Sequence, residues 1–115
     1  MKFKFKIWIE KDDGEPVLGK GGYRLIKSII ELGSISQSSK KLGLSYKFAW
    51  SYIKRLNNAI PSGIIMRKGG KNAGGSIVSD KLKKIIELYD EAEKEINEVI
   101  EKYNKKLNEI LNEEQ

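Results

Sequence analysis

The side chains best suited to bind a ligand lie on one face of a helix that the sequence predicts near the middle of the chain. Lysine and arginine can neutralise phosphates, serine and asparagine can hydrogen bond to base edges, and an aromatic ring can contact a thymine methyl group or a sugar. No Asp or Glu occurs between Ser45 and Asn58, as expected for a helix that lies against phosphates. The predicted DNA-facing residues, at helical spacing, are Lys47, Trp50, Ser51, Lys54 and Asn58, flanked by Tyr46 and Arg55.

Trp50 has two interpretations that the sequence does not separate. Its place on the polar face favours contact with DNA. Its ring could instead fold over Phe3, Trp8 or the hairpin that follows and fill the edge of the core.

A second basic element is predicted at the tip of a glycine-rich hairpin, between strands over residues 63–68 and 76–79. Such tips reach along the DNA backbone or into the minor groove, where Arg and Lys are favoured. A nucleotide-binding loop is the alternative, but the glycine spacing does not match G-x-x-x-x-G-K-[ST]. The tip residues predicted to bind DNA are Arg67, Lys68, Lys71 and Asn72.

Local signals predict the elements that carry these residues. Alternation predicts a strand from Lys2 to Glu10, and apolar spacing predicts helices over residues 23–32, 37–42 and 46–58. We expect Ser36 and Ser45 to cap the second and third helices, and glycines at 33 and 43 to end the first and second. This order predicts a mainly α fold with a small β-wing, a winged helix-turn-helix; an αα-hairpin in another helical domain is the alternative.

A last helix is predicted from Ser79, as its N-cap, to about Asn112, and apolar residues recur along it with the a/d spacing of a coiled coil. Its first part, up to Tyr89, should pack on the domain formed by residues 1–78, and its outer part should pair with a second copy. The chain therefore divides into a DNA-binding domain, 1–78, and a dimerising helix, 79–115. The predicted dimerisation residues are Leu82, Ile85, Tyr89, Ala92, Ile96, Val99, Tyr103, Leu107 and Ile110.

The amino-acid composition favours some classes of function and disfavours others. Residues 1–78 hold 15 Lys or Arg against 5 Asp or Glu, whereas residues 79–115 hold 7 against 11. A basic body favours a polyanionic partner, although a Lys/Glu-rich surface without such a partner explains the charge equally well. The chain has no Cys and no His, so we expect no enzyme activity, no metal and no cofactor. It shows no signal peptide and no long apolar run, which predicts a cytoplasmic, nucleoid-associated protein.

Three stretches resemble a known family: GSISQSSKKLGLSYKFAWSYIKRLN, MRKGGKNAGG and IWIEKDDGEPVLGKGG. Together they are similar to the N-terminal DNA-binding domain of the ModE family, molybdate-responsive transcriptional regulators related to LysR-type winged helices, over about residues 5–90. The resemblance implies a homodimer that reads a palindromic operator in double-stranded DNA. It implies groove contacts from Ser45, Tyr46, Lys47, Trp50 and Ser51, phosphate contacts from Ser36 and Gln37, and a wing that includes Arg67.

The resemblance has two departures. The family often has alanines where Ser38 and Ser39 stand. Full-length members carry C-terminal oxyanion-binding domains, and nothing in these 115 residues resembles a molybdate pocket. A separate sensor protein and the absence of any small-molecule ligand are therefore both open.

Three other functions remain as alternatives to a sequence-specific regulator. An architectural chromatin protein would bind DNA with little sequence preference and a steep salt dependence. A protein-interaction adaptor is disfavoured by the acid-free helix and the basic hairpin. An enzyme has no supporting set of residues.

Overall fold

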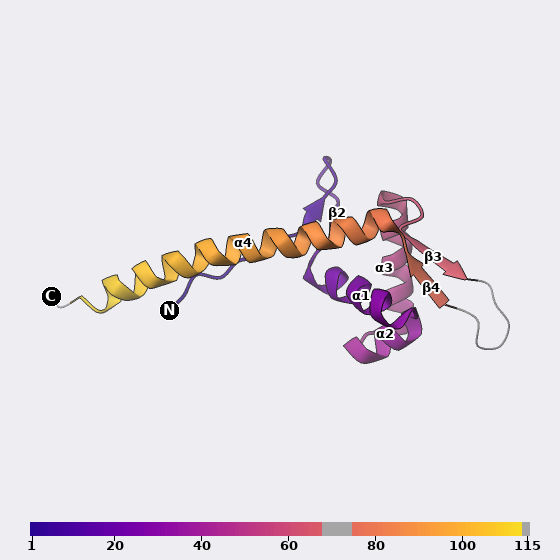
Figure 1. Ribbon diagram of the computed structural model, residues 1–115, viewed down its shortest axis with the longest axis horizontal. Coiled ribbons are helices and arrows are strands. Elements are labelled where there is room, and N and C mark those ends of the chain that lie inside the picture. The colour runs from indigo at the N-terminus through magenta and orange to yellow at the C-terminus, as the bar shows by residue number, and fades with distance from the viewer. Residues whose placement is uncertain (68–74, 114–115) are drawn as a thin grey trace.

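The computed structural model describes residues 1–67 and 75–113, and within them two short strand pairs accompany four helices (Figure 1). Strand β3 pairs with β4 antiparallel, and β1 with β2 antiparallel. Within the described ranges, no helix is long and apolar enough to cross a membrane. The elements are β1 (Ile9–Glu10), β2 (Pro16–Leu18), α1 (Lys20–Leu32), α2 (Ile35–Leu42), α3 (Tyr46–Ala59), β3 (Ile64–Arg67), β4 (Gly75–Val78) and α4 (Asp80–Leu111).

Glycines in the left-handed conformation end α1 and α2 as predicted, with φ 65° at Gly33 and 68° at Gly43. The prediction that Ser36 caps α2 was wrong. The side chain of Ser34 accepts a hydrogen bond from the Gln37 amide at 3.1 Å, so α2 begins two residues earlier than expected. The reason is packing, because Ile35 is buried and belongs to the inner face of the first turn.

The core lies where α1, α3 and the start of α4 meet the two strand pairs. Leu82 and Tyr89 of α4 are only 0% and 4% exposed, so the first part of α4 belongs to the body, as predicted. Burial in their own body removes both residues from the predicted dimerisation set. The buried apolar residues are Leu18, Tyr23, Leu25, Ile26, Ile29, Ile35, Ala49, Ile53, Leu56, Ile64, Val78, Leu82, Ile86 and Tyr89.

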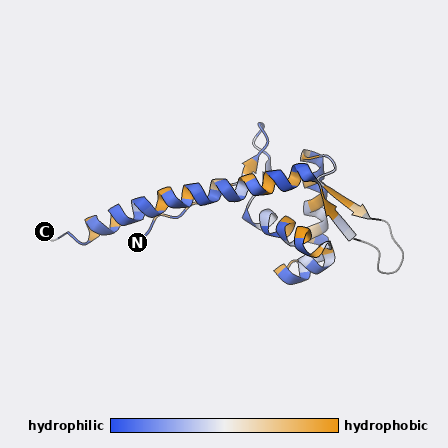
Figure 2. Ribbon diagram, viewed as in Figure 1, coloured by the Kyte–Doolittle hydropathy of each residue, from blue (hydrophilic) through white to orange (hydrophobic). Residues whose placement is uncertain are grey.

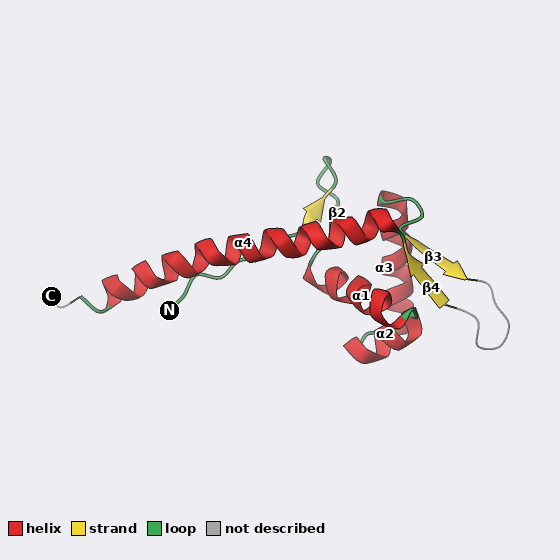
Figure 3. Ribbon diagram, viewed as in Figure 1, coloured by secondary structure: helices red, strands yellow, loops and turns green. Residues whose placement is uncertain are grey.

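The predicted strand from Lys2 to Glu10 forms only at Ile9–Glu10, where it pairs with β2. Residues 1–8, the N-terminal arm, run alongside α4 without strand pairing (Figure 3). The amide of Phe3 donates to Asn104 Oδ1 at 2.5 Å, and the Tyr89 hydroxyl donates to the Ile7 carbonyl at 3.0 Å. The alternating pattern reflects an extended segment with one partly covered face. Side chains of α4, and not a neighbouring strand, cover that face.

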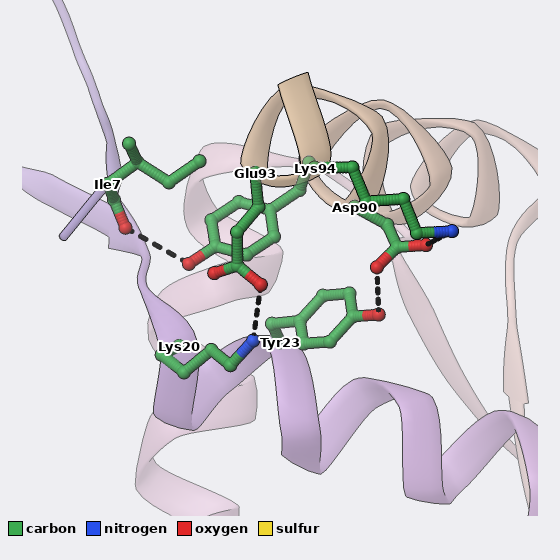
Figure 4. Close-up of polar contacts among 7 residues, drawn as sticks. Ile7, Lys20, Tyr23, Asp90, Glu93 and Lys94 are labelled. Atoms are coloured by element: carbon green, nitrogen blue, oxygen red, sulfur yellow. Dashed lines mark hydrogen bonds and ion pairs between the residues drawn. The ribbon is translucent and has the colours of Figure 1, made fainter. Parts of the chain in front are cut away.

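Polar contacts between α1 and α4, the clasp, fix the direction in which α4 leaves the body (Figure 4). Lys20 Nζ lies 2.5 Å from Glu93 Oε1, and the Tyr23 hydroxyl donates to Asp90 Oδ1 at 3.0 Å. The rings of Tyr23 and Tyr89 stack with centroids 5.0 Å apart. Because these contacts come from successive turns of α4, they hold it in both position and rotation.

The clasp predicts a distinctive pH dependence of stability. The hydrogen bond from Tyr23 is the main reason that the pKa of Asp90 lies below its ordinary 3.8, whereas burial, followed by Asp90, raises the pKa of Tyr23 to about 12. A lowered carboxyl pKa stabilises the fold above about pH 4, and this contribution is lost as the pH falls through the folded-state value. A raised phenol pKa stabilises the fold below about pH 10, and this contribution is lost as the pH rises through about 12.

We expect Tyr23→Phe to flatten both the acid and the alkaline fall in the free energy of unfolding, measured by urea titration across pH. Tyr52→Phe is the matched control. Burial raises the pKa of Tyr52 to about 12 as well, but its hydroxyl donates to the carbonyl of Val17 and not to a carboxylate. Tyr52→Phe should therefore change only the alkaline limb. An acid limb equally changed in both variants would contradict the role of Asp90.

Beyond the body, α4 alternates hydrophobic positions with hydrophilic ones (Figure 2). Of the predicted dimerisation residues there, Ala92, Ile96 and Leu107 are half-buried within the single chain. Val99, Tyr103 and Ile110 are exposed, and so is Leu88, which was not predicted. The single chain thus leaves part of the apolar surface of α4 uncovered.

Candidate nucleic-acid interface

Burial of one face fixes the rotation of α3. The Ser45 hydroxyl accepts a hydrogen bond from the Phe48 amide at 3.0 Å, which confirms the predicted N-cap. Ala49, Ile53 and Leu56 are at most 1% exposed. With about 3.6 residues per turn, the opposite face of the helix must point outward.

That outward face carries the predicted residues. Lys47, Ser51 and Lys54 stand one or two turns apart at its centre, and no carboxylate lies on the helix. Within the described residues, the side chains of Lys47, Lys54 and Arg55 form no ion pair. Donors of this kind remain available to phosphates and base edges. The exposed predicted residues of α3 and its cap are Ser45, Tyr46, Lys47, Ser51, Lys54 and Arg55, together with Asn58.

Trp50 takes an intermediate position. Its side chain is half-buried and packs against the core cluster. At about 100° per residue it stands a quarter-turn from Ala49, on the flank of α3 and not at the centre of the outward face. The core therefore covers part of the Trp50 ring, and contact between the rest of the ring and DNA stays a prediction.

The predicted phosphate contacts lie at the start of α2. Ser36 and Gln37 are exposed in its first turn. Ser36 of α2 and Tyr46 of α3, which were both predicted to contact DNA, line one shallow hollow of about 200 Å³. Its other lining residues include Met66 and Ser76 of the β3–β4 hairpin, so this hollow joins α2, α3 and the hairpin.

The hairpin is anchored to the body at its base. Its register pairs Ile64 with Val78 and Arg67 with Gly75, and the Ser76 amide donates to the Gly33 carbonyl at 2.9 Å. The predicted tip residues Lys68, Lys71 and Asn72 lie outside the described residues, and of Arg67 only the backbone is described. Their DNA contacts stay predictions.

Asn57 is a positioning residue that the sequence did not reveal. Its Oδ1 accepts from the Ile64 amide at 2.9 Å, and its Nδ2 donates to the Ile64 carbonyl at 3.0 Å. Asn57 thus pairs with both backbone groups of the first hairpin residue, as a neighbouring strand would. It fixes the hairpin relative to α3, and no local pattern distinguishes it from any other asparagine near a helix end.

The small residues where α2 meets its neighbours are buried. Ser38 is 0% exposed and Ser39 is 2% exposed. The Ser39 hydroxyl donates to the Ile35 carbonyl at 2.8 Å. The Ser38 hydroxyl has no hydrogen-bond partner among the described residues.

We therefore expect Ser38→Ala to stabilise the protein, because it removes a buried hydroxyl that lacks a partner. Ser39→Ala is the matched control, since it gives the same helix the same residue but removes a satisfied hydroxyl. The free energy of unfolding should be higher in Ser38→Ala than in Ser39→Ala by about 1–2 kcal/mol. Equal stabilities in urea titrations would show that the Ser38 hydroxyl is satisfied in solution.

Comparison with known proteins points in the same direction as the geometry. The transcriptional regulator ModE of Haemophilus influenzae is 38% identical over 72 residues, which cover 62% of this chain and 28% of the relative. The molybdenum transport protein ModE of Azotobacter vinelandii is 33% identical over 95 residues, 82% of this chain and 35% of the relative. The DNA-binding transcriptional dual regulator ModE of Escherichia coli is 40% identical over 67 residues, 57% of this chain and 26% of the relative.

These matches cover only part of each relative, and this limits the conclusion to that part. The chain spans about a quarter to a third of the length of these relatives. No protein-family model matches it. Over part of its length, the chain is related to ModE transcriptional regulators.

Proposed function

We propose that the chain is a sequence-specific DNA-binding transcriptional regulator that acts as a homodimer. In this proposal α2, the turn at residues 43–45 and α3 form a helix-turn-helix, and the β3–β4 hairpin is its wing. The observation that carries the proposal is the outward face of α3, where Lys47, Ser51 and Lys54 are exposed and no carboxylate is present.

Three features of the body support a role in reading DNA. The core holds α3 by its opposite face, so the outward side chains are presented on a rigid element. Ser36 and Gln37 stand exposed at the start of α2, the place from which phosphates would be contacted. Asn57 fixes the hairpin beside α3, which would place a helix and a wing on one duplex.

The names of the relatives support transcription regulation in particular. The matched Escherichia coli protein is named a DNA-binding transcriptional dual regulator. An architectural chromatin protein would also carry a basic face, but it needs no base-reading residues such as Ser51. Regulation of genes by the homodimer is therefore the function that we propose.

The homodimer rests on the outer half of α4. Val99, Tyr103 and Ile110 are exposed apolar residues on a helix that extends beyond the body (Figure 1). Pairing would bury these residues and present two α3 helices to one duplex. Two half-sites related by a two-fold axis follow from such symmetry.

Selection of bound DNA from a random-sequence pool at about 0.15 M salt tests the proposal, because nonspecific electrostatic binding is partly screened there. An inverted-repeat consensus supports a dimeric, sequence-specific regulator. Binding without any consensus would favour an architectural protein, and no binding at low salt would overturn a role on DNA.

A further inference from the structure

A cavity of about 280 Å³ lies between α1, α2 and α3, on one flank of α3. Phe48 and Tyr52 of α3 line it, and at about 100° per residue they stand about 140–180° around the helix from Asn57, which holds the hairpin. The cavity therefore lies on the side of α3 opposite the hairpin. Binding sites for small molecules usually measure about 300–1,000 Å³, and about 150 Å³ is enough for benzene, so this cavity has room for one or two aromatic rings.

The walls of the cavity are apolar and partly open to solvent. The Phe48 ring is 53% exposed. Leu42 of α2 and Leu44 of the turn are half-buried and complete the wall. The one polar atom of the Tyr52 side chain already has a partner, since its hydroxyl donates to the Val17 carbonyl at 3.0 Å. A flat, apolar ring is the group that such walls accommodate best.

Among the described residues, the only charged side chain that lines the cavity belongs to Arg24 of α1. Arg24 is exposed, and it takes part in none of the ion pairs found in residues 1–67 and 75–113. The first turn of α1 holds no acidic residue, and the N-terminal end of a helix carries a partial positive charge. An anionic group on the ligand, and a carboxylate in particular, is therefore favoured beside Arg24.

A neighbouring hollow of about 240 Å³ shares Phe48 and Tyr52 with the cavity and extends towards β2. Its charged groups already have partners. Lys11 forms an ion pair with Glu15 at 3.1 Å, and the Arg55 guanidinium lies over the Tyr52 ring, 5.7 Å from its centroid. The cavity beside Arg24 is thus the better site for an anionic ligand.

We propose that this cavity binds a small aromatic carboxylate, with its ring against Phe48 and the two leucines and its carboxylate paired with Arg24. The ligand then acts as an effector of DNA binding, and this part of the inference rests on the proposed function. Leu44 and Phe48 belong to the proposed helix-turn-helix, and Phe48 directly follows Lys47. A bound carboxylate therefore adds a negative charge close to the phosphates of the duplex and weakens binding.

Naphthoate, which has two fused rings and one carboxylate, is a suitable probe, and naphthamide is its uncharged match. In an NMR titration of the full chain without DNA, naphthoate should shift the amide resonances of Gly21, Leu44 and Phe48 first. Its non-hydrogen atoms, about 13 in number, predict a dissociation constant of about 1 mM or tighter at the usual efficiency of drug-sized ligands. Naphthamide should bind about fivefold more weakly, the loss expected for an exposed ion pair.

Substitutions on α1 locate the ligand. Arg24→Gln should weaken naphthoate binding about fivefold and change naphthamide binding by less than about twofold. Lys27→Gln is the matched control, because Lys27 is exposed on the same helix but does not line the cavity, and it should change neither. A Cβ on Gly21 would have nothing within 4 Å, so Gly21→Leu extends a side chain into the open space at the cavity. This variant should weaken both probes about tenfold or more, since side chain and ligand would compete for one space.

A second titration, with the selected operator duplex, tests the effector role. Saturating naphthoate should lower operator affinity about threefold or more, and the operator should weaken naphthoate binding by the same factor, because coupling between two ligands is reciprocal. In Gly21→Leu, naphthoate should leave operator affinity unchanged.

The outcomes separate this inference from the proposed function. No shift of the cavity resonances at ten times the expected dissociation constant would overturn the site and leave the proposed function untouched. Equal binding of naphthoate and naphthamide, unchanged in Arg24→Gln, would overturn the anionic ligand. Naphthoate binding that leaves operator affinity unchanged would overturn the effector role. A chain that binds naphthoate but selects no DNA sequence would overturn the proposed function and the effector role, while the site remains.

Discussion

Lys47→Glu is expected to lower affinity for the selected operator about 100-fold or more at 0.15 M salt. Lys47 lies in the first turn of α3, and in the proposed helix-turn-helix this end of the helix meets base edges. Loss of one base or phosphate contact costs about 1–3 kcal/mol, and a carboxylate in its place adds repulsion from the phosphates. Fluorescence anisotropy with a labelled operator duplex measures the change.

The matched control is Lys27→Glu, which changes the net charge by the same amount. Lys27 is exposed on α1, close enough to Asp90 of α4 to influence its pKa, and therefore lies on the α4 side of the body. Its substitution should change affinity by less than about threefold at this ionic strength, where exposed charges are screened beyond about 8–10 Å. Equal losses in the two variants would mean that net charge determines binding, and the α3 face would lose its assigned role.

Replacement by alanine separates contacts to bases from contacts to phosphates at the same face. A phosphate contact weakens all sequences alike and reduces the salt slope by about 1 when it is removed. Loss of a base contact relaxes sequence choice at one position instead. Comparing the affinities of Lys47→Ala and Lys54→Ala for the operator and for a random duplex therefore shows which of the two roles each lysine has.

Local chemistry made the centre of the fold predictable from sequence. Ser45 caps α3 and Gly43 ends α2, because a cap hydroxyl and a left-handed turn depend only on a few neighbouring residues. The same period that buries Ala49 and Ile53 turns Lys47 and Lys54 outward. Exposure of the candidate site thus followed from the sequence, whereas its binding to DNA remains a prediction.

The errors share one cause, which is that contacts between distant residues override local signals. Alternation from Lys2 to Glu10 indicates an extended chain with one covered face, but cannot reveal that α4, about 80–100 residues away, supplies the cover. Ser34 and Ser36 are equally good caps until Ile35 is known to be buried. Asn57 resembles any polar residue near a helix end until the hairpin folds against it.

The start of α1 is a further example, and it leads to a sharp prediction. The sequence predicts a first helix that begins only at residue 23, yet Gly21 and Gly22 lie in the first turn of α1. A Cβ on Gly22 would lie 1.8 Å from the Tyr52 hydroxyl oxygen, whereas a Cβ on Gly21 would have nothing within 4 Å. Gly22 is therefore required where α3 crosses α1, and Gly21 is not.

We expect Gly21→Ala to stabilise the protein by about 0.5–1 kcal/mol, the usual gain of alanine over glycine within a helix. Gly22→Ala should destabilise it by about 1–3 kcal/mol, since Tyr52 cannot move aside without losing its hydrogen bond to the Val17 carbonyl. Two adjacent substitutions of the same kind in one helix would then differ by about 1.5–4 kcal/mol in the free energy of unfolding. Urea titration measures both.

A double-mutant cycle identifies the cause of the difference. In a Tyr52→Leu background the hydroxyl and the outer ring atoms are gone, so Gly22→Ala should become nearly neutral or stabilising, like Gly21→Ala. The single and double variants would then show that the two glycines differ through one aromatic side chain of α3. If Gly22→Ala lowers the free energy of unfolding equally without the Tyr52 ring, the loss of stability must arise in α1 itself. Close contact between α1 and α3 would then not be the reason that glycine is needed at the start of α1.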